Sequence, residues 1–143
     1  EAGRASYAPD AVRDSVVAVL ERVNEAASRK DIDAFMELWE RSDSLVYVRS
    51  GQAFMGWDAV AENHREGFST PGTWSFRTGE VHVRVLGPES GVATAFTLTS
   101  APRWFLLTAT VAATPSGWKI VQAHGSYAES GMNPFGEPQL LPE

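Results

Sequence analysis

The second half of the chain constrains the fold most, because strand-like runs alternate there with short links that contain Gly, Pro and Ser. The runs combine β-branched and aromatic residues with alternating apolar and polar positions, and they lie at about Trp74–Leu86, Val92–Ser100, Trp104–Thr114 and Trp118–Tyr127. Links this short join neighbouring antiparallel strands. The sequence therefore predicts an antiparallel meander of long strands.

One irregularity is expected in the first of these runs. Trp74 and Phe76 share one face of the strand, Val81 and Val83 share the other, and Gly79 stands between the two sets. A change of face at a glycine is typical of a β-bulge, in which one extra residue bends the strand. We therefore predict a bulge near Gly79 and a bend in the sheet there.

The first half of the chain has the periodicity of helices instead. Apolar residues recur every three or four positions in three segments, from Asp10 to about Ala27, from Asp31 to Trp39 and from Trp57 to Phe68. Asp10 after Pro9 and Asp31 are helix start signals. The third segment contains His64 on its apolar side and ends before Thr70-Pro71-Gly72.

A short strand, Leu45–Arg49, and a hairpin turn, Ser50-Gly51-Gln52, precede the third helix. This order of elements predicts an α+β fold in which three helices from the N-terminal half cover one face of a strongly curved, mainly antiparallel sheet. Such a packing encloses a pocket, and it leaves the other sheet face as a natural surface for a homodimer. We assign residues 9–128 to one domain, 1–8 to an N-terminal extension and 129–143 to a Pro-containing tail.

Composition excludes several classes of function. The chain has 143 residues and a net charge of −6, so we expect no nonspecific nucleic-acid binding. Its longest nearly apolar stretch, Trp104–Ala113, is far shorter than the roughly 20 residues that span a bilayer, so no membrane partner is expected. With no cysteine, no close spacing among three histidines and no phosphate-binding loop, we predict no metal and no cofactor. Glu1 in place of Met fits removal of a leader or tag, which leaves a cytoplasmic and an exported location open.

His124 is the first candidate for chemistry. Strand alternation puts it on one face with Gln122 and Ser126 and with the apolar Trp118 and Ile120. A neutral imidazole on a pocket wall can transfer a proton near physiological pH. The alternative is a buried histidine that only orders the core.

Tyr47 and Arg49 extend from the same side of the short strand and together offer a phenol donor and a fixed cation. They face the pocket if the Leu45 side of the strand is the inner one. If Val46 and Val48 face inwards instead, Tyr47 packs at an interface and Arg49 is solvated. His64 either points into the pocket from the third helix or is an ordinary core residue.

Three further residues complete the set of candidates. Trp104, which follows Pro102-Arg103, is expected at the pocket rim. Asp43 is more simply a turn residue between two serines than a base at the pocket mouth. His82 alternates with Glu80 and Arg84, so we expect it on a polar surface without a catalytic role.

Three segments resemble a known family: Phe35-x-x-Leu38-Trp39, Gly56-Trp57-Asp58-Ala59-Val60, and above all Gly117-Trp118-Lys119-Ile120-Val121-Gln122-Ala123-His124-Gly125-Ser126. They look like the SnoaL-like branch of the NTF2-like superfamily, over about residues 9–128. The resemblance implies a cone-shaped α+β fold, commonly dimeric, with a pocket used for isomerisation, polyketide cyclisation, dehydration, epoxide hydrolysis or binding. Such proteins often carry an Arg at the position of Leu106, two residues before Thr108, on the pocket wall. Leu106 therefore favours an apolar or weakly polar ligand.

Three hypotheses for function follow. The first is a cofactor-independent lyase, isomerase or cyclase for a small hydrophobic carbonyl or hydroxyl compound, with His124 as acid or base and Tyr47 or Arg49 polarising an oxygen. Its substrate-binding residues would be His64, Trp104, Gln122, Leu106, Thr108 and Ser126. The second is a noncatalytic module that binds a hydrophobic ligand in the same pocket. The third is a dimerising accessory domain whose sheet face is the functional surface.

Overall fold

The computed structural model describes residues 6–135. In chain order they form α1 (Pro9–Ser28), α2 (Ile32–Met36), β1 (Val46–Arg49), β2 (Gln52–Met55), α3 (Trp57–Phe68), β3 (Phe76–Gly87), β4 (Ser90–Thr99), β5 (Arg103–Thr114) and β6 (Gly117–Tyr127). Most of the predicted N-terminal extension and the tail beyond residue 135, with Pro138 and Pro142, lie outside the described residues. None of the helices within residues 6–135 is long and apolar enough to cross a membrane.

The strands form one curved sheet in the order β2-β1-β6-β5-β4-β3. The predicted meander is confirmed, because β3, β4, β5 and β6 pair antiparallel in chain order. The β1–β2 hairpin joins this meander through a parallel pairing of β1 with β6. Its turn residues, Ser50 and Gly51, have φ values of 49° and 86°, as the favoured two-residue hairpin turns require.

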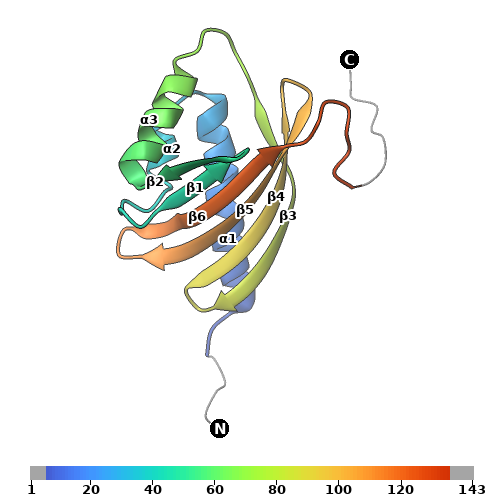
Figure 1. Ribbon diagram of the computed structural model, residues 1–143. Coiled ribbons are helices and arrows are strands. Elements are labelled where there is room, and N and C mark those ends of the chain that lie inside the picture. The colour runs from blue at the N-terminus through green and yellow to red at the C-terminus, as the bar shows by residue number, and fades with distance from the viewer. Residues whose placement is uncertain (1–5, 136–143) are drawn as a thin grey trace.

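The helices cover one face of this sheet (Figure 1). α1 begins at Pro9, with Asp10 in its first turn, and packs mainly on β3 and β4. α2 begins where Asp31 predicted, because the Asp31 carboxylate accepts a 3.0 Å hydrogen bond from the Ala34 amide. It ends at Met36 rather than Trp39, since Trp39 instead forms a bridge with Ile120 of β6. The predicted α+β cone is thereby confirmed.

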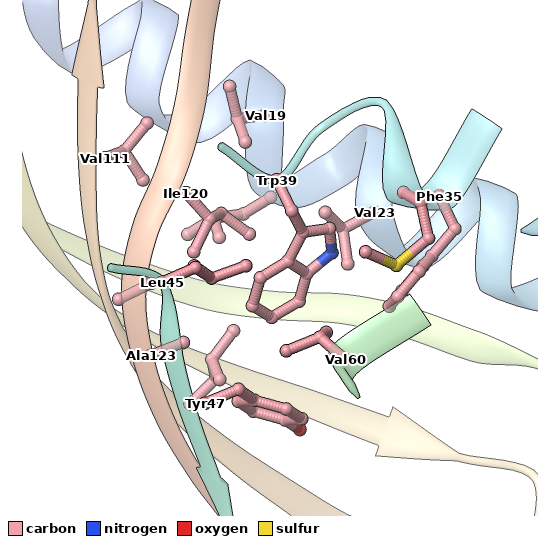
Figure 2. Close-up of a cluster of buried hydrophobic side chains, with 14 of the residues drawn as sticks. Val19, Val23, Phe35, Trp39, Leu45, Tyr47, Val60, Val111, Ile120 and Ala123 are labelled. Carbon is pink, nitrogen blue, oxygen red and sulfur yellow. The ribbon is translucent and has the colours of Figure 1, made fainter. Parts of the chain in front are cut away.

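The core lies between the helices and the inner sheet face. Figure 2 shows Trp39 at its centre, with Leu45 and Ile120 on one side, Phe35 and Val23 on the other, and Tyr47 and Val60 next to it. Leu45 and Ile120 are fully buried. Trp39 is 3% exposed, and its Nε1 atom has no hydrogen-bond partner within residues 6–135.

Two of the register shifts in the described sheet decide which side chains face the core. The register shifts between Thr78 and Val81 of β3, which confirms the bulge predicted near Gly79. A Cβ on Gly79 would lie 2.8 Å from the carbonyl oxygen of Phe96, so the strands approach too closely there for a side chain. A second shift, which was not predicted, lies in β6: Thr110 pairs with Gln122, and Val111 pairs with Ile120. Val121 is the extra residue, and it exchanges the two faces of β6.

The C-terminal segment after β6 lies against the outer face of the sheet. The Phe135 ring is 4.7 Å from Phe96 and 6.1 Å from Trp104 between centroids. This part of the predicted tail is therefore draped over a surface. It covers side chains of β4 and β5.

Candidate functional site

The inner face of the sheet and the helices enclose a cavity of about 660 Å³, a size typical of small-molecule sites. Its walls come from all three helices and from every strand. The apolar part consists of Leu20, Val23, Ala27, Phe35, Trp39, Phe68, Phe76, Ala95, Phe105 and Leu107.

Small residues on the inner sheet face make room for this cavity. Ala95, Ala109 and Ala123 are buried and face the helices. The neighbouring residues of β4 and β5 that face the other way are larger, and they include Phe96, Leu98 and Leu106. Alanines at these inner positions leave more space under the helices than larger side chains would, and this space forms part of the cavity.

Tyr47 and Arg49 extend into the cavity from β1. Of the two faces that the sequence left open, the one with Leu45 and Tyr47 is the inner one, since these two side chains are 0% and 3% exposed. Burial raises the pKa of Tyr47 to about 12, and the charge of Arg49 offsets part of this rise. The phenol is therefore a protonated hydrogen-bond donor at any physiological pH.

Arg49 is half-buried beside Tyr47. Its Nη2 donates a 2.9 Å hydrogen bond to Oδ1 of Asn63 on α3. Its guanidinium carbon lies 5.4 Å from the ring centroid of Phe54 and 5.8 Å from that of Tyr47, within the range of cation–π attraction. These contacts fix a positive charge in the wall of the cavity.

His64 lies deeper, on α3, and is 8% exposed. Its ring centroid is 4.6 Å from Phe35 and 5.5 Å from Tyr47, whose ring it stacks on. The pKa of His64 is lowered to about 4, mainly by burial and to a smaller extent by the positive charge of Arg49, while a hydrogen bond to Val60 opposes the shift. The imidazole is therefore neutral near pH 7.

The hydrogen bond of His64 assigns its tautomer. Nδ1 lies 2.8 Å from the carbonyl oxygen of Val60, and because a carbonyl can only accept, Nδ1 carries the proton. Nε2 then has a free lone pair. Within residues 6–135, Nε2 of His64 is not one of the buried side-chain atoms that lack a hydrogen-bond partner. The His64 side chain lines the cavity. A proton acceptor, a phenol donor and a fixed cation thus lie together.

A second polar group lines the cavity opposite the hairpin. Nδ2 of Asn24, on α1, donates hydrogen bonds of 2.8 Å and 3.1 Å to the hydroxyl groups of Thr78 and Thr97. Sequence reasoning missed this cluster. The available signal was Asn24 itself, which occupies the helical position between the buried Leu20 and Ala27.

The predicted position of His124 on the pocket wall is wrong. His124, Gln122 and Ser126 are exposed on the outer face of the sheet, because the bulge at Val121 turns every later residue of β6 over. Ala123, Gly125 and Tyr127 face inwards in their place. The same applies on β5, where Leu106 pairs with Ser126, and Thr108 pairs with His124.

Leu106 and Thr108 are therefore outer-face residues as well, and the phenyl ring of Phe105 and the side chain of Leu107 line the cavity instead. Contrary to the prediction, Leu106 therefore does not decide the polarity of the pocket wall. The wall does have a cation, because Arg49 supplies it from β1.

The remaining candidates lie outside the cavity. Trp104 is on the outer face beside Phe135 rather than at the pocket rim, because Phe105 is the inward residue. Asp43 is exposed in its turn. His82 is exposed, and its Nε2 lies 2.9 Å from a carboxylate oxygen of Glu80, as expected for a polar surface. Within residues 6–135, no group of three His, Cys, Asp or Glu side chains is arranged to hold a metal ion.

Comparison with known proteins gives one family. The model of the SnoaL-like domain matches residues 16–130. No curated protein matches the sequence.

Solved structures share the fold at low sequence identity. A candidate dehydratase of the NTF2-like family from Streptomyces avermitilis is 19% identical, with a TM-score of 0.74 over 86% of this chain and 100% of that one. An NTF2-like superfamily protein from Salmonella enterica serovar Typhimurium is 18% identical, with a TM-score of 0.73 over 89% of this chain and 99% of that one. A cystatin-like fold protein from Burkholderia xenovorans is 22% identical, with a TM-score of 0.69 over 82% and 92%.

Proposed function

The chain belongs to the SnoaL-like domain family, and we propose that its cavity binds a small, mainly apolar carbonyl or hydroxyl compound and moves a proton next to the oxygen of that compound. The observation that carries this proposal is the grouping of His64, Tyr47 and Arg49 in one cavity wall. The reaction class is that of a cofactor-independent lyase, isomerase or cyclase.

Each of the three side chains has a definite role in this reaction. Tyr47 donates a hydrogen bond to the carbonyl oxygen of the substrate, and the charge of Arg49 stabilises the negative charge that develops as an enolate forms. Nε2 of His64 takes the proton from the adjacent carbon. Return of the proton from His64 to another carbon completes an isomerisation. In a dehydration the protonated His64 instead gives the proton to a hydroxyl one carbon further along, the C–O bond breaks as the enolate collapses to a C=C bond, and water leaves.

The fold-level likeness to the Streptomyces candidate dehydratase agrees with this reaction class, although a shared fold does not transfer a reaction. The low pKa of His64, about 4, favours a second candidate function, binding without conversion, because an imidazole with this pKa is a weak base. A bound anionic oxygen near Arg49 would oppose the influence of that cation and raise the pKa of His64.

One experiment separates these functions. The protein is screened by thermal shift against 2-oxo, 3-oxo and 3-hydroxy compounds with six to ten carbons, and the compounds that bind are incubated with it in D₂O. ¹H NMR then follows loss of signal at the carbon next to the carbonyl. We expect exchange with the wild type and with His124→Gln, and none with His64→Gln.

Binding without exchange in the wild type would select the noncatalytic function. Exchange that persists in His64→Gln would exclude His64 as the base. If no compound raised the melting temperature, the small-molecule proposal itself would fail.

We also propose that the protein is a homodimer that uses the outer face of the sheet. This face carries the half-buried Val46, Val48 and Leu106, which helices do not cover (Figure 1). A second copy of the same face would bury these side chains through a two-fold interface.

A further inference from the structure

Among the residues that the structure describes, Arg49 has no acidic partner. Within residues 6–135 the ion pairs are Arg13 with Asp10, His82 with Glu80, and Lys119 with Glu37. The hydrogen-bond partner of Arg49 is instead the neutral side chain of Asn63. Among the lining residues, Arg49 is the one Lys or Arg side chain. Its charge therefore faces the cavity without compensation by a carboxylate.

The surroundings of Arg49 suit an anionic group better than a neutral one. Phe54 and Tyr47 present ring faces to the guanidinium, which lowers its access to water. The guanidinium also donates a hydrogen bond to the Tyr47 hydroxyl, and both of its side-chain acceptors, Tyr47 and Asn63, are neutral. A guanidinium has five N–H donors, and two of them match the two oxygens of a carboxylate. Glu66 also lines the cavity, but it is exposed and forms no ion pair with Arg49.

The overall charge of the protein makes this local cation decisive. The net charge is −6, so long-range repulsion opposes the approach of an anionic ligand. Recognition of an anion therefore depends on Arg49 and its hydrogen-bonding neighbours. These neighbours are the phenol of Tyr47 and the amide of Asn63, both of which accept a hydrogen bond from Arg49 and still carry N–H or O–H donors of their own.

We propose that the ligand is a small organic carboxylate whose carboxylate group binds Arg49 and whose apolar body occupies the cavity along Val23, Phe35 and Leu107. This inference rests on the proposed function and narrows its substrate class. It also divides the roles within the site, since Arg49 holds the carboxylate while Tyr47 and His64 face the atoms next to it. The Tyr47 and His64 rings are 5.5 Å apart between centroids, so both side chains can reach one part of a bound ligand.

The test uses matched probes that differ in charge alone. Binding of 3-phenylpropanoate and 3-phenylpropanamide, and of hexanoate and hexanamide, is measured by isothermal titration calorimetry at pH 7. We expect the wild type to bind each acid at least about tenfold more tightly than its amide, and to lose this preference as salt is added. Arg49→Met and Arg49→Gln should bind acid and amide equally. Arg65→Met removes an exposed arginine of α3, and this variant should keep the wild-type preference.

The outcomes separate this inference from the function on which it rests. Equal or tighter binding of the amides by the wild type would contradict the proposal that the ligand is a carboxylate, and it would leave the proposed binding in the cavity intact. An acid preference that survived in folded Arg49→Met and Arg49→Gln would overturn the role of Arg49. If neither acids nor amides bound, both the inference and the proposed binding function would fall. Retained melting transitions in the Arg49 variants show that any loss of preference does not come from unfolding.

Discussion

The aromatic side chains around His64 hold it in its neutral form, and this ties the stability of the fold to pH. The ordinary pKa of 6.5 applies in the unfolded chain, while the folded pKa is about 4. Between these values the unfolded state binds a proton that the folded state does not. The free energy of unfolding therefore decreases as the pH falls from about 6.5 to 4. Above this range the imidazole is neutral in both states, and His64 does not lower the stability.

We predict that His64→Phe removes this pH dependence. From pH 7 to pH 4, the free energy of unfolding of the wild type should fall by about 3 kcal/mol more than that of the variant, which corresponds to a pKa difference of about 2.5. Urea unfolding at a series of pH values measures both curves. His124→Gln is the control, since His124 is exposed, and it should follow the wild type. Parallel curves for wild type and His64→Phe would contradict the burial of a neutral imidazole.

Two residues of the final-strand motif, Lys119 and Ile120, act in the fold rather than in the cavity. Ile120 is fully buried, and Lys119 is 8% exposed. The Lys119 ammonium donates a hydrogen bond to the carbonyl oxygen of Glu37, at the end of α2, and contacts its carboxylate at 3.2 Å. These two residues join the end of α2 to β6, and they carry no information about the chemistry of the cavity.

At the scale of elements, the periodicity of apolar residues predicts the helices and strands that have a regular repeat. The three helices, the meander and the Gly79 bulge follow from apolar spacing and from the residues that end each run. The bulge at Val121 does not, because it inserts no Gly or Pro into β6. One unrecognised extra residue moved His124 to the outer face. The inner position of Tyr47 and Arg49 also needed the structure, since both faces of β1 carry apolar residues.

Two glycines in the sheet have different neighbours, and this gives a prediction for each. A Cβ on Gly79 would meet the backbone oxygen of Phe96 at 2.8 Å, whereas one on Gly125 would overlap the ring of Phe105. Backbone cannot move aside, so Gly79→Ala should lower the free energy of unfolding by about 1–3 kcal/mol without changing the cavity. The Phe105 ring can rotate, and Gly125→Ala should displace it.

Because Phe105 lines the cavity, the displaced ring in Gly125→Ala should change the shape of the binding site more than the stability of the fold. Denaturant unfolding measures the stability of both variants, and crystal structures give the side-chain conformation of Phe105. A ring that kept its position in Gly125→Ala, or a cavity altered by Gly79→Ala, would show that the two neighbours do not differ in this way.

At the scale of the whole molecule, the sheet has an unusual distribution of side-chain size. Its inner face carries small residues such as Ala95 and Ala109, and its outer face carries Phe96 and Leu106 on the same strands. Small inner residues leave space for a ligand, while larger apolar residues on the outer face gain from burial by another surface. Phe135 packs on Phe96 and Trp104 of that face, and Val48 and His124 lie side by side on β1 and β6.

The proposed homodimer can be tested by a substitution at Leu106 on the outer face of the sheet. We expect Leu106→Glu to convert the dimer to a monomer, because a two-fold interface would bring the new carboxylates of both copies into an apolar contact and bury them there without partners. Sedimentation velocity at micromolar to 100 micromolar concentrations gives the mass. Ala11→Glu, which adds the same charge at an exposed position of α1, should remain a dimer. Since Leu106 does not line the cavity, the monomeric variant should still bind a cavity ligand. A wild type that stayed monomeric throughout, or a Leu106→Glu variant that stayed dimeric, would exclude this face as the interface.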